Sequence, residues 1–186
     1  MKFRTLLLVL LSLATMSALA QKKFTPAPTF LKGEKEINVL FDYSDVKYDK
    51  ESQESYYKSK SSAWIEEWEG KRRENNEGQF ISYLNDEFRK LNINAGNYPE
   101  AKYTMIVEVR DCDFGAFAGP FSVPAKLTCM IRMVETGTTI FLSSLMLKES
   151  QNPYTVIGTP IDFDRIFLAF GEVGEGVGEK LYKILK

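Results

Sequence analysis

The segment that decides the fold spans residues 103–148, and it opens with Tyr103-Thr104-Met105-Ile106-Val107-Glu108-Val109. Two more strand-like runs follow at 127–134 and 140–147, separated by the turn sequence Glu-Thr-Gly-Thr at 135–138. Side chains of a strand alternate between its two faces, and the first two runs place apolar residues at alternate positions. These residues therefore predict three consecutive strands, with antiparallel hairpins, at the centre of a sheet.

Upstream of this segment, the sequence predicts one more strand and a helix. Residues 37–43 alternate apolar and polar side chains with one exception, as strands do. Residues 63–91 are helical in character and form either one long helix or two pieces broken near Gly78. A helix between two strands makes a β-α-β unit, in which the two strands run parallel. The apolar stripe of this helix consists of Phe80, Leu84, Phe88 and Leu91.

The last segment predicts a second helix, from Pro160 to about Leu185. Thr159-Pro160-Ile161-Asp162 is a capping-box sequence with Pro at the first helical position. Four glycines lie within this helix, and their spacing does not match a phosphate-binding loop. They indicate either a close approach of the helix to the sheet or a local break between 174 and 178. The four are Gly171, Gly174, Gly176 and Gly178.

Together these elements predict an α+β fold with the order β-α-β-β-β-α. We expect a two-layer sandwich, in which a mixed sheet of about four strands carries two helices on one face. The other face of the sheet is expected to be uncovered, because Glu108, Arg110, Lys126 and Arg132 lie on it. The predicted core consists of Met105, Val107, Val109, Leu127, Ile131, Met133, Leu84, Phe88 and Phe170.

The N-terminus predicts export. Lys2 and Arg4 precede an apolar run at 5–13, and Ala18-Leu19-Ala20 is a cleavage site of the signal-peptide type. The alternative is an uncleaved anchor, but the apolar run is shorter than the roughly 20 residues of a spanning helix. We therefore expect a signal peptide at 1–20, an extended leader at 21–36 and a single domain at 37–186. Because Gln21, not Cys, follows the cleavage site, we expect a periplasmic or secreted protein without a lipid anchor.

Composition excludes several function classes. The chain has no His, which removes the usual Ser-His-Asp and Cys-His hydrolase arrangements. The 24 basic and 25 acidic residues give no basic surface for a nucleic acid. Asp42, Asp45 and Asp49 lack the spacing of a calcium loop. We therefore expect no metal and no cofactor, and no later apolar run is long enough to span a membrane.

Cys112 and Cys129 are the only cysteines, and in an exported protein two cysteines suggest a disulfide. Strand parity argues against it, because the two side chains are expected on opposite faces of the paired strands. A bulge near Asp111 would bring them to the same face. Without it, Cys129 is a small buried apolar residue and Cys112 lies near a loop.

Aromatic residues supply the candidate binding sites. Phe114, Phe117 and Phe121 lie on the Gly- and Pro-containing loop at 111–124, which either folds back over the sheet or forms an apolar tip for a partner. Trp64 and Trp68 lie one helical turn apart, and they either pack inside the protein or form an exposed platform for a glycan or partner.

Two alternatives to a binding role remain. Asp111 and Asp113 share a strand face, and glycoside hydrolysis needs two carboxyl groups about 5–9.5 Å apart across a cleft. They are the best available pair for a carboxylate-based hydrolase acting on an extracellular substrate. A carrier of a small apolar ligand would instead need a large cavity between the helices and the sheet.

The order of elements resembles the small α/β domains of bacterial envelope proteins, such as the N-terminal domain of the Tol-system protein TolB and the curli-secretion protein CsgG. The resemblance covers about residues 37–186 and includes the strand, Glu-Thr-Gly turn and returning strand at 125–147. Uncharacterised secreted proteins of gut-type bacteria share this layout. The resemblance implies a non-enzymatic binding or assembly module whose partner is a protein or another envelope component. The chain departs from these proteins in having no lipid-anchoring Cys and no second domain such as a propeller.

Overall fold

The computed structural model describes residues 23–118, 122–151 and 161–186. The expected signal peptide at 1–20 lies outside these ranges, as do Phe121 and the first two residues of the expected capping box, Thr159 and Pro160. No helix within the described ranges is both long enough and apolar enough to cross a membrane.

The elements with a clear periodicity are present in the predicted order: β1, α4, β5, β6, β7 and α5. Short elements that have no recognisable period lie between them. In chain order the described elements are η1 (Thr29–Leu31), β1 (Glu36–Asp42), β2 (Lys47–Tyr48), β3 (Glu51–Ser52), α2 (Gln53–Lys58), α3 (Ser62–Glu67), η2 (Trp68–Arg72), α4 (Arg73–Phe88), η3 (Arg89–Leu91), β4 (Asn94–Gly96), β5 (Tyr103–Asp113), β6 (Lys126–Glu135), β7 (Phe141–Ser150) and α5 (Asp162–Leu185).

The sheet is mixed and has seven strands, so the prediction of about four was too low. Two partners share one side of β5: β1 pairs in parallel with residues 104–108, and β2 pairs in parallel with residues 111–112. On the other side, β6 and β7 continue the sheet in antiparallel pairs. The predicted parallel and antiparallel relations are confirmed, and the additional strands β2, β3 and β4 have only two or three residues each.

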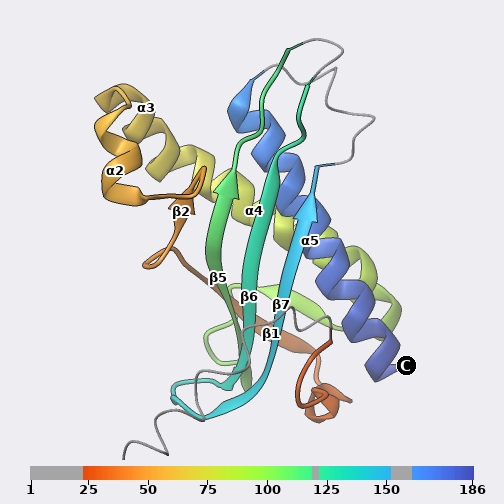
Figure 1. Cartoon of the computed structure of the whole chain (residues 1–186). Helices are drawn as coiled ribbons and strands as arrows, with labels where there is room; N and C mark the ends of the chain where they lie inside the picture. Colours follow the sequence, from red (N-terminus) through yellow and green to blue (C-terminus); the bar gives the residue numbers. More distant parts are fainter. Residues whose placement is uncertain (1–22, 119–121, 152–160) are drawn as a thin grey trace, which may run out of the picture.

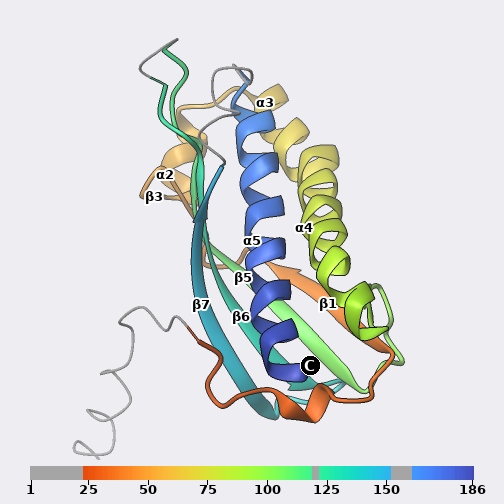
Figure 2. The ribbon, with the colours of Figure 1, turned by 90° about the vertical axis from the view of Figure 1, so that its right-hand side faces the viewer.

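Helices α4 and α5 lie side by side on one face of the sheet, as predicted, with α5 over β6 and β7 (Figures 1 and 2). The core lies between these two layers. Burial of one Val, Leu, Ile, Phe or Met side chain contributes roughly 1.5–3 kcal/mol to the free energy of unfolding. The layer between the helices and the sheet is therefore the main source of stability. Every predicted core residue is at most 1% exposed: Met105, Val107, Val109, Leu127, Ile131, Met133, Leu84, Phe88 and Phe170.

Glycines of α5 set the distance between the two helices. A methyl group at Gly174 would lie 2.3 Å from the carbonyl oxygen of Phe80, and one at Gly178 would lie 2.8 Å from Cβ of Glu87. The predicted close approach is therefore confirmed, but for these two positions the neighbour is α4, not the sheet. Gly176 does face the sheet, where a methyl group would lie 3.1 Å from Leu147. Because α5 continues unbroken to Leu185, the alternative of a local break was wrong.

The first helical segment breaks at Gly70, not at Gly78. Gly70 has the non-helical angles φ −92° and ψ −117°, and the backbone widens to a π-helix at η2. Gly78 lies inside the regular helix α4, where a methyl group would have no neighbour within 4 Å. The N-terminus of α5 also differs from the prediction, because the residue that precedes the helix is Ile161, without a side-chain cap.

The leader is packed from residue 23 onward, although an extended leader was expected. Phe24 is 5% exposed and Leu31 is fully buried. The backbone of Thr25 exchanges two hydrogen bonds with Ser144 of β7, with N···O distances of 2.9 and 3.1 Å. The leader thus pairs with the free edge of β7 at Thr25. Burial of Phe24 and Leu31 in the core holds the leader in this position.

A methyl group should have opposite effects at two glycines of the helix pair. Gly174→Ala places it against the carbonyl oxygen of Phe80, so we expect the free energy of unfolding to fall by about 1–3 kcal/mol. Gly78→Ala places it in open space within α4, so we expect a rise of about 1 kcal/mol. Urea unfolding measures both changes, and an unaltered stability of Gly174→Ala would contradict the close contact.

Candidate functional site

One end of the molecule carries no charge over two long segments. Asp113, Lys126 and Ser150 form the last paired row across β5, β6 and β7. Beyond this row, residues 114–125 and 151–161 contain no Asp, Glu, Lys or Arg, in a chain that is 26% charged. We call the described part of these segments, residues 114–118, 122–125, 151 and 161, the uncharged end.

Apolar side chains of the uncharged end are exposed. Phe117 and Val123 are each 44% exposed, and Ile161 at the start of α5 is 52% exposed. Ala116 and Val123 exchange two backbone hydrogen bonds, with N···O distances of 3.0 and 2.7 Å, so their segments form a two-stranded arm that projects beyond the sheet (Figure 1). Because Gly115 has φ +64° and a methyl group there would lie 2.3 Å from the carbonyl oxygen of Val123, only glycine fits at the base of the arm.

Phe114 fastens this arm to the body of the protein. Its side chain is 2% exposed. Its backbone N–H donates to Oδ1 of Asp49 at 2.9 Å, and its carbonyl oxygen accepts from Nε of Arg165 at 3.0 Å. Arg165 is 1% exposed and also pairs with Asp162, so the arm, the β2–β3 turn and the first turn of α5 are tied together.

The aromatic residues predicted for a binding site come together beneath the arm. The ring of Phe114 lies 5.2 Å from that of Trp68 and 5.8 Å from that of Trp64. Trp68 is fully buried, Trp64 is partly buried, and both tryptophans also contact Phe163 of α5. An exposed platform is therefore wrong for Trp68, and an exposed tip is wrong for Phe114, because both belong to the core. Phe117 is exposed, as the alternative of an apolar tip predicts, and a binding role for these residues stays a prediction.

The sequence did not indicate the tyrosines of this cluster. Tyr48 is fully buried, and its hydroxyl oxygen accepts from Nε1 of Trp68 at 3.0 Å and from Nη2 of Arg73 at 3.1 Å. Burial raises the pKa of the Tyr48 hydroxyl, which keeps it neutral. From α2, Tyr57 stacks on Tyr48, and the ring of Tyr56 contacts Tyr48 at a tilt. The available signal was the aromatic content of residues 44–62, which is unusual for a polar connection.

No described helix covers the face of the sheet opposite α4 and α5. The predicted charged residues lie on this face. Glu108 accepts from Nε of Arg132 at 2.7 Å and also pairs with Arg110. These two arginines leave Glu108 only 6% exposed. Arg110 reaches further to Asp45, at 3.0 Å. Four charged residues on this side, Glu108, Arg110, Arg132 and Asp45, are therefore paired with each other, which makes it a weaker candidate surface than the uncharged end.

A bulge at Arg110 changes which face the end of β5 presents. The pairing skips from Val109 to Asp111, so Cys112 points into the core on the same side as Cys129. The expectation of opposite faces was wrong, and the bulge lies where it would repair the parity. Both cysteines are fully buried free thiols, and burial raises the pKa of each.

The same bulge places both carboxylates of the hydrolase alternative on the uncovered face. Asp111 pairs with Thr128 and Asp113 with Lys126, which confirms the shared face. Burial raises the pKa of Asp111, Lys148 opposes this shift, and Asp113 adds to it. Oδ1 of Asp111 is buried and has no hydrogen-bond partner among the described residues. Of four surface pockets lined by described residues, none includes either carboxylate.

Comparisons with known proteins show likeness in fold only. No family model matches the chain, and no curated protein matches it. A PelC dodecamer from Paraburkholderia phytofirmans is 8% identical, with a TM-score of 0.45, over 83% of this chain and 96% of that one. Protein XCC0632 from Xanthomonas campestris, of family DUF330, is 11% identical, with a TM-score of 0.41, over 80% of this chain and 84% of that one. The resemblance to TolB and CsgG stays a prediction.

The raised pKa of Asp111 predicts a pH-dependent effect of Asp111→Asn. An acid whose pKa is higher in the folded than in the unfolded chain stabilises the fold only while protonated, and this contribution is lost as the pH rises through the folded pKa. We therefore expect Asp111→Asn to stabilise the protein at pH 7. The gain should vanish below about pH 4, where Asp111 is protonated in both states. Urea unfolding at the two pH values measures it, and a loss of stability at pH 7 would contradict the assignment.

Proposed function

We propose that this chain is an exported, non-enzymatic binding or assembly module of the bacterial envelope, which contacts its partner through the uncharged end. The observation that carries the proposal is the exposure of Phe117, Val123 and Ile161 on segments without a single charge. Charged residues normally separate apolar ones on a protein surface, and contiguous exposed apolar residues mark contact sites. The partner is a protein or another envelope component with an apolar surface of its own.

The way the arm is held supports a role in binding. Gly115 sets its direction, and the buried Phe114 and Arg165, together with the exposed Asp49, hold its base. A contact surface whose base is held in place loses less conformational entropy when a partner binds. The aromatic cluster that contains Trp64 and Trp68 then supports the surface from below, without touching the partner.

The sequence supplies the support for export. The basic, apolar and small-residue regions of residues 1–20 have the pattern of a signal peptide. An apolar, uncharged end suits a protein that works beside membranes and membrane proteins. Periplasmic and fully secreted locations are equally compatible with it.

Two alternatives have less support. The hydrolase alternative is favoured by the raised pKa of Asp111, which suits a general acid, but a hydrolase also needs a cleft that places both carboxylates against a substrate. The carrier alternative needs a cavity between the helices and the sheet. The pocket of about 390 Å³ beside Phe24 and Ile184 lies instead between the leader and the last turns of α5.

Exposed apolar residues at the two ends of the molecule allow a matched test. The double variant Phe117→Ser/Val123→Ser alters the uncharged end, and Ile140→Ser/Phe141→Ser alters an exposed pair at the opposite end, where each residue is 53% exposed. Immobilised protein without residues 1–20 is incubated with envelope extract of the bacterium that encodes it. We expect the first variant to lose at least five-fold in recovery of specific components, and the second to recover as much as the original.

Circular dichroism is the control for folding. We expect both variants to remain folded, because all four side chains are exposed. Equal recovery with Phe117→Ser/Val123→Ser would rule out the uncharged end as the contact surface. Equal losses with both variants would show that recovery reflects general hydrophobic adhesion, and this would also contradict the proposal.

A further inference from the structure

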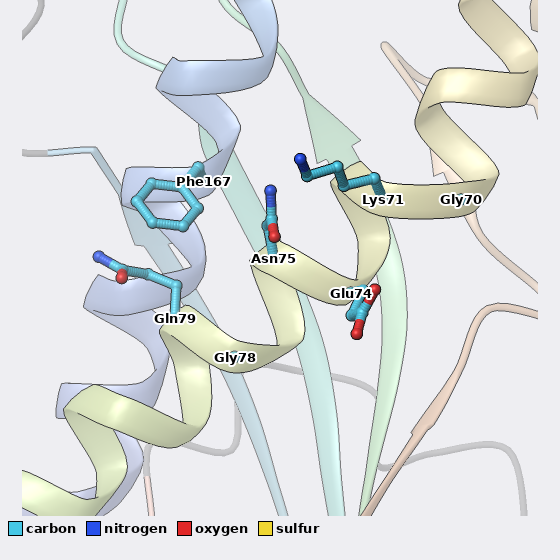
Figure 3. A pocket seen from close by; sticks show the side chains of 7 residues that line it. All are labelled: Gly70, Lys71, Glu74, Asn75, Gly78, Gln79 and Phe167. Atoms are coloured by element: carbon cyan, nitrogen blue, oxygen red, sulfur yellow. The ribbon is translucent and has the colours of Figure 1, made fainter.

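A cleft separate from the uncharged end lies along the first half of α4, beside α5. It has a volume of about 1020 Å³ and is open to solvent. Figure 3 shows the ring of Phe167, from α5, facing the side chains of Asn75 and Gln79 from α4. The cleft is lined by Gly70, Lys71, Glu74, Asn75, Gly78, Gln79 and Phe167.

A smaller recess of about 170 Å³ adjoins the cleft, because Asn75 and Phe167 line both. Asn76 lines the recess and is only 2% exposed, yet its Nδ2 has no hydrogen-bond partner among the described residues. An amide N–H₂ that is buried without an acceptor is unfavourable, and most such groups in proteins have a partner. An acceptor group of a ligand that reaches into the recess would satisfy this donor.

Two glycines of the cleft have no role in internal packing. A methyl group at Gly70 or Gly78 would have no neighbour within 4 Å. Gly174 and Gly178 differ from them, because their lack of a side chain is what lets α5 contact α4. The non-helical angles at the break account for Gly70. Gly78 lies inside the regular helix α4, where glycine is unfavourable, so its use at this open position needs another reason. Close approach of a ligand to the helix backbone is such a reason.

The charged residues around the cleft leave no excess of positive charge. Arg72 pairs with Glu67 at 2.7 Å and with Asp164 at 3.5 Å, so its charge is already neutralised. Lys71 and Glu74 contribute one charge of each sign. A phosphate or a polyanion would need an excess of positive charge, which this surface does not have. What remains for recognition is a set of amides and the phenylalanine ring.

We propose that the cleft binds an uncharged oligosaccharide. Sugar hydroxyl groups donate and accept hydrogen bonds, as do the amides of Asn75 and Gln79, and one hydroxyl would be an acceptor for Nδ2 of Asn76. The C–H face of a pyranose ring packs on the negative face of an aromatic ring, here Phe167. A pyranose ring can lie against helix backbone only where side chains are missing. In this cleft the side chain is missing at Gly70 and Gly78.

An extended peptide fits this cleft less well. Each of its backbone N–H and C=O groups needs a partner once buried. The walls of the cleft are helices, whose own backbone groups are largely paired inside the helix. Three side-chain amides, from Asn75, Asn76 and Gln79, would leave most groups of a peptide unpaired, whereas outward-facing sugar hydroxyls stay in water.

The probes for this site are maltohexaose, cellohexaose and the hexamer of N-acetylglucosamine, with an uncharged Ala/Ser hexapeptide as the competing class. We expect at least one oligosaccharide to bind with a Kd of about 1 mM or tighter, measured by titration calorimetry. In NMR spectra, the same sugar should shift the side-chain amide signals of Asn75, Asn76 and Gln79. These signals report on the cleft itself and not on the uncharged end, so this test is independent of the proposed function.

Two variants test the cleft by different means. Gly78→Ala fills the open floor and Asn76→Leu removes the unused donor, and each should weaken sugar binding at least ten-fold. Thermal unfolding keeps the test interpretable, because Gly78→Ala should raise the Tm by about 2–4 °C. Asp86→Ala, on an exposed part of α4 outside the cleft, is the control and should leave the Kd unchanged within two-fold.

Three results would overturn the proposal. One is the absence of binding by all three oligosaccharides. Another is binding that survives both Gly78→Ala and Asn76→Leu in the folded state. The third is a shift of the cleft amides by the hexapeptide and not by any sugar, which would assign the cleft to a peptide instead.

Discussion

Between Gly174 and the carbonyl oxygen of Phe80 there is no room for even one more carbon atom, and the position of the helix layer depends on that contact. Successive positions of α5 meet successive positions of α4, which makes the two helices parallel and holds them at backbone distance. Toward their N-terminal ends the contact weakens, and at Gly171 a methyl group would meet only the side chains of Gln79 and Tyr83. The cleft opens just beyond this point. The tight crossing and the open cleft are therefore two parts of one arrangement.

A second set of contacts decides what happens at the end of the sheet. Strands β5, β6 and β7 end at one paired row, and the arm extends beyond it from β5 and β6. The aromatic cluster around Tyr48, Trp68 and Phe114 anchors this arm, and the buried Arg165 links it to α5. The buried hydroxyl of Tyr48 accepts hydrogen bonds from Trp68 and Arg73, which a low-dielectric interior favours. The exposed Phe117 can then be presented to a partner while its neighbour Phe114 is held inside.

The sequence predicts those parts of the structure that repeat. Periods of two and of 3.6 residues located β1, β5, β6, α4 and most of α5, together with the core between them. Strands β2, β3 and β4 were missed because two or three residues show no period. Burial of Trp68 and Phe114 depends on Tyr48 and α2, which are distant in sequence. Composition alone does not decide whether such an aromatic side chain is buried or exposed. Glycine shows the same limit: Gly70, Gly78 and Gly174 look alike in sequence, and only their neighbours in space separate a break, an open floor and a tight crossing.

The bulge at Arg110 reverses the alternation of side chains between the two faces of β5. Before it, odd-numbered residues of β5 face the helices; after it, even-numbered residues do, which is why Cys112 and Phe114 lie inside while Asp111 and Asp113 lie outside. Loss of this one residue would turn the upper part of the strand over, exposing the anchor of the arm and burying two carboxylates. Between the bulge and Gly115, substitutions are compatible with this arrangement. An insertion or deletion of one residue is not, because it would exchange the two faces. Beyond Gly115, the arm is free to lengthen or shorten, so new contact surfaces can arise there without disturbing the sheet.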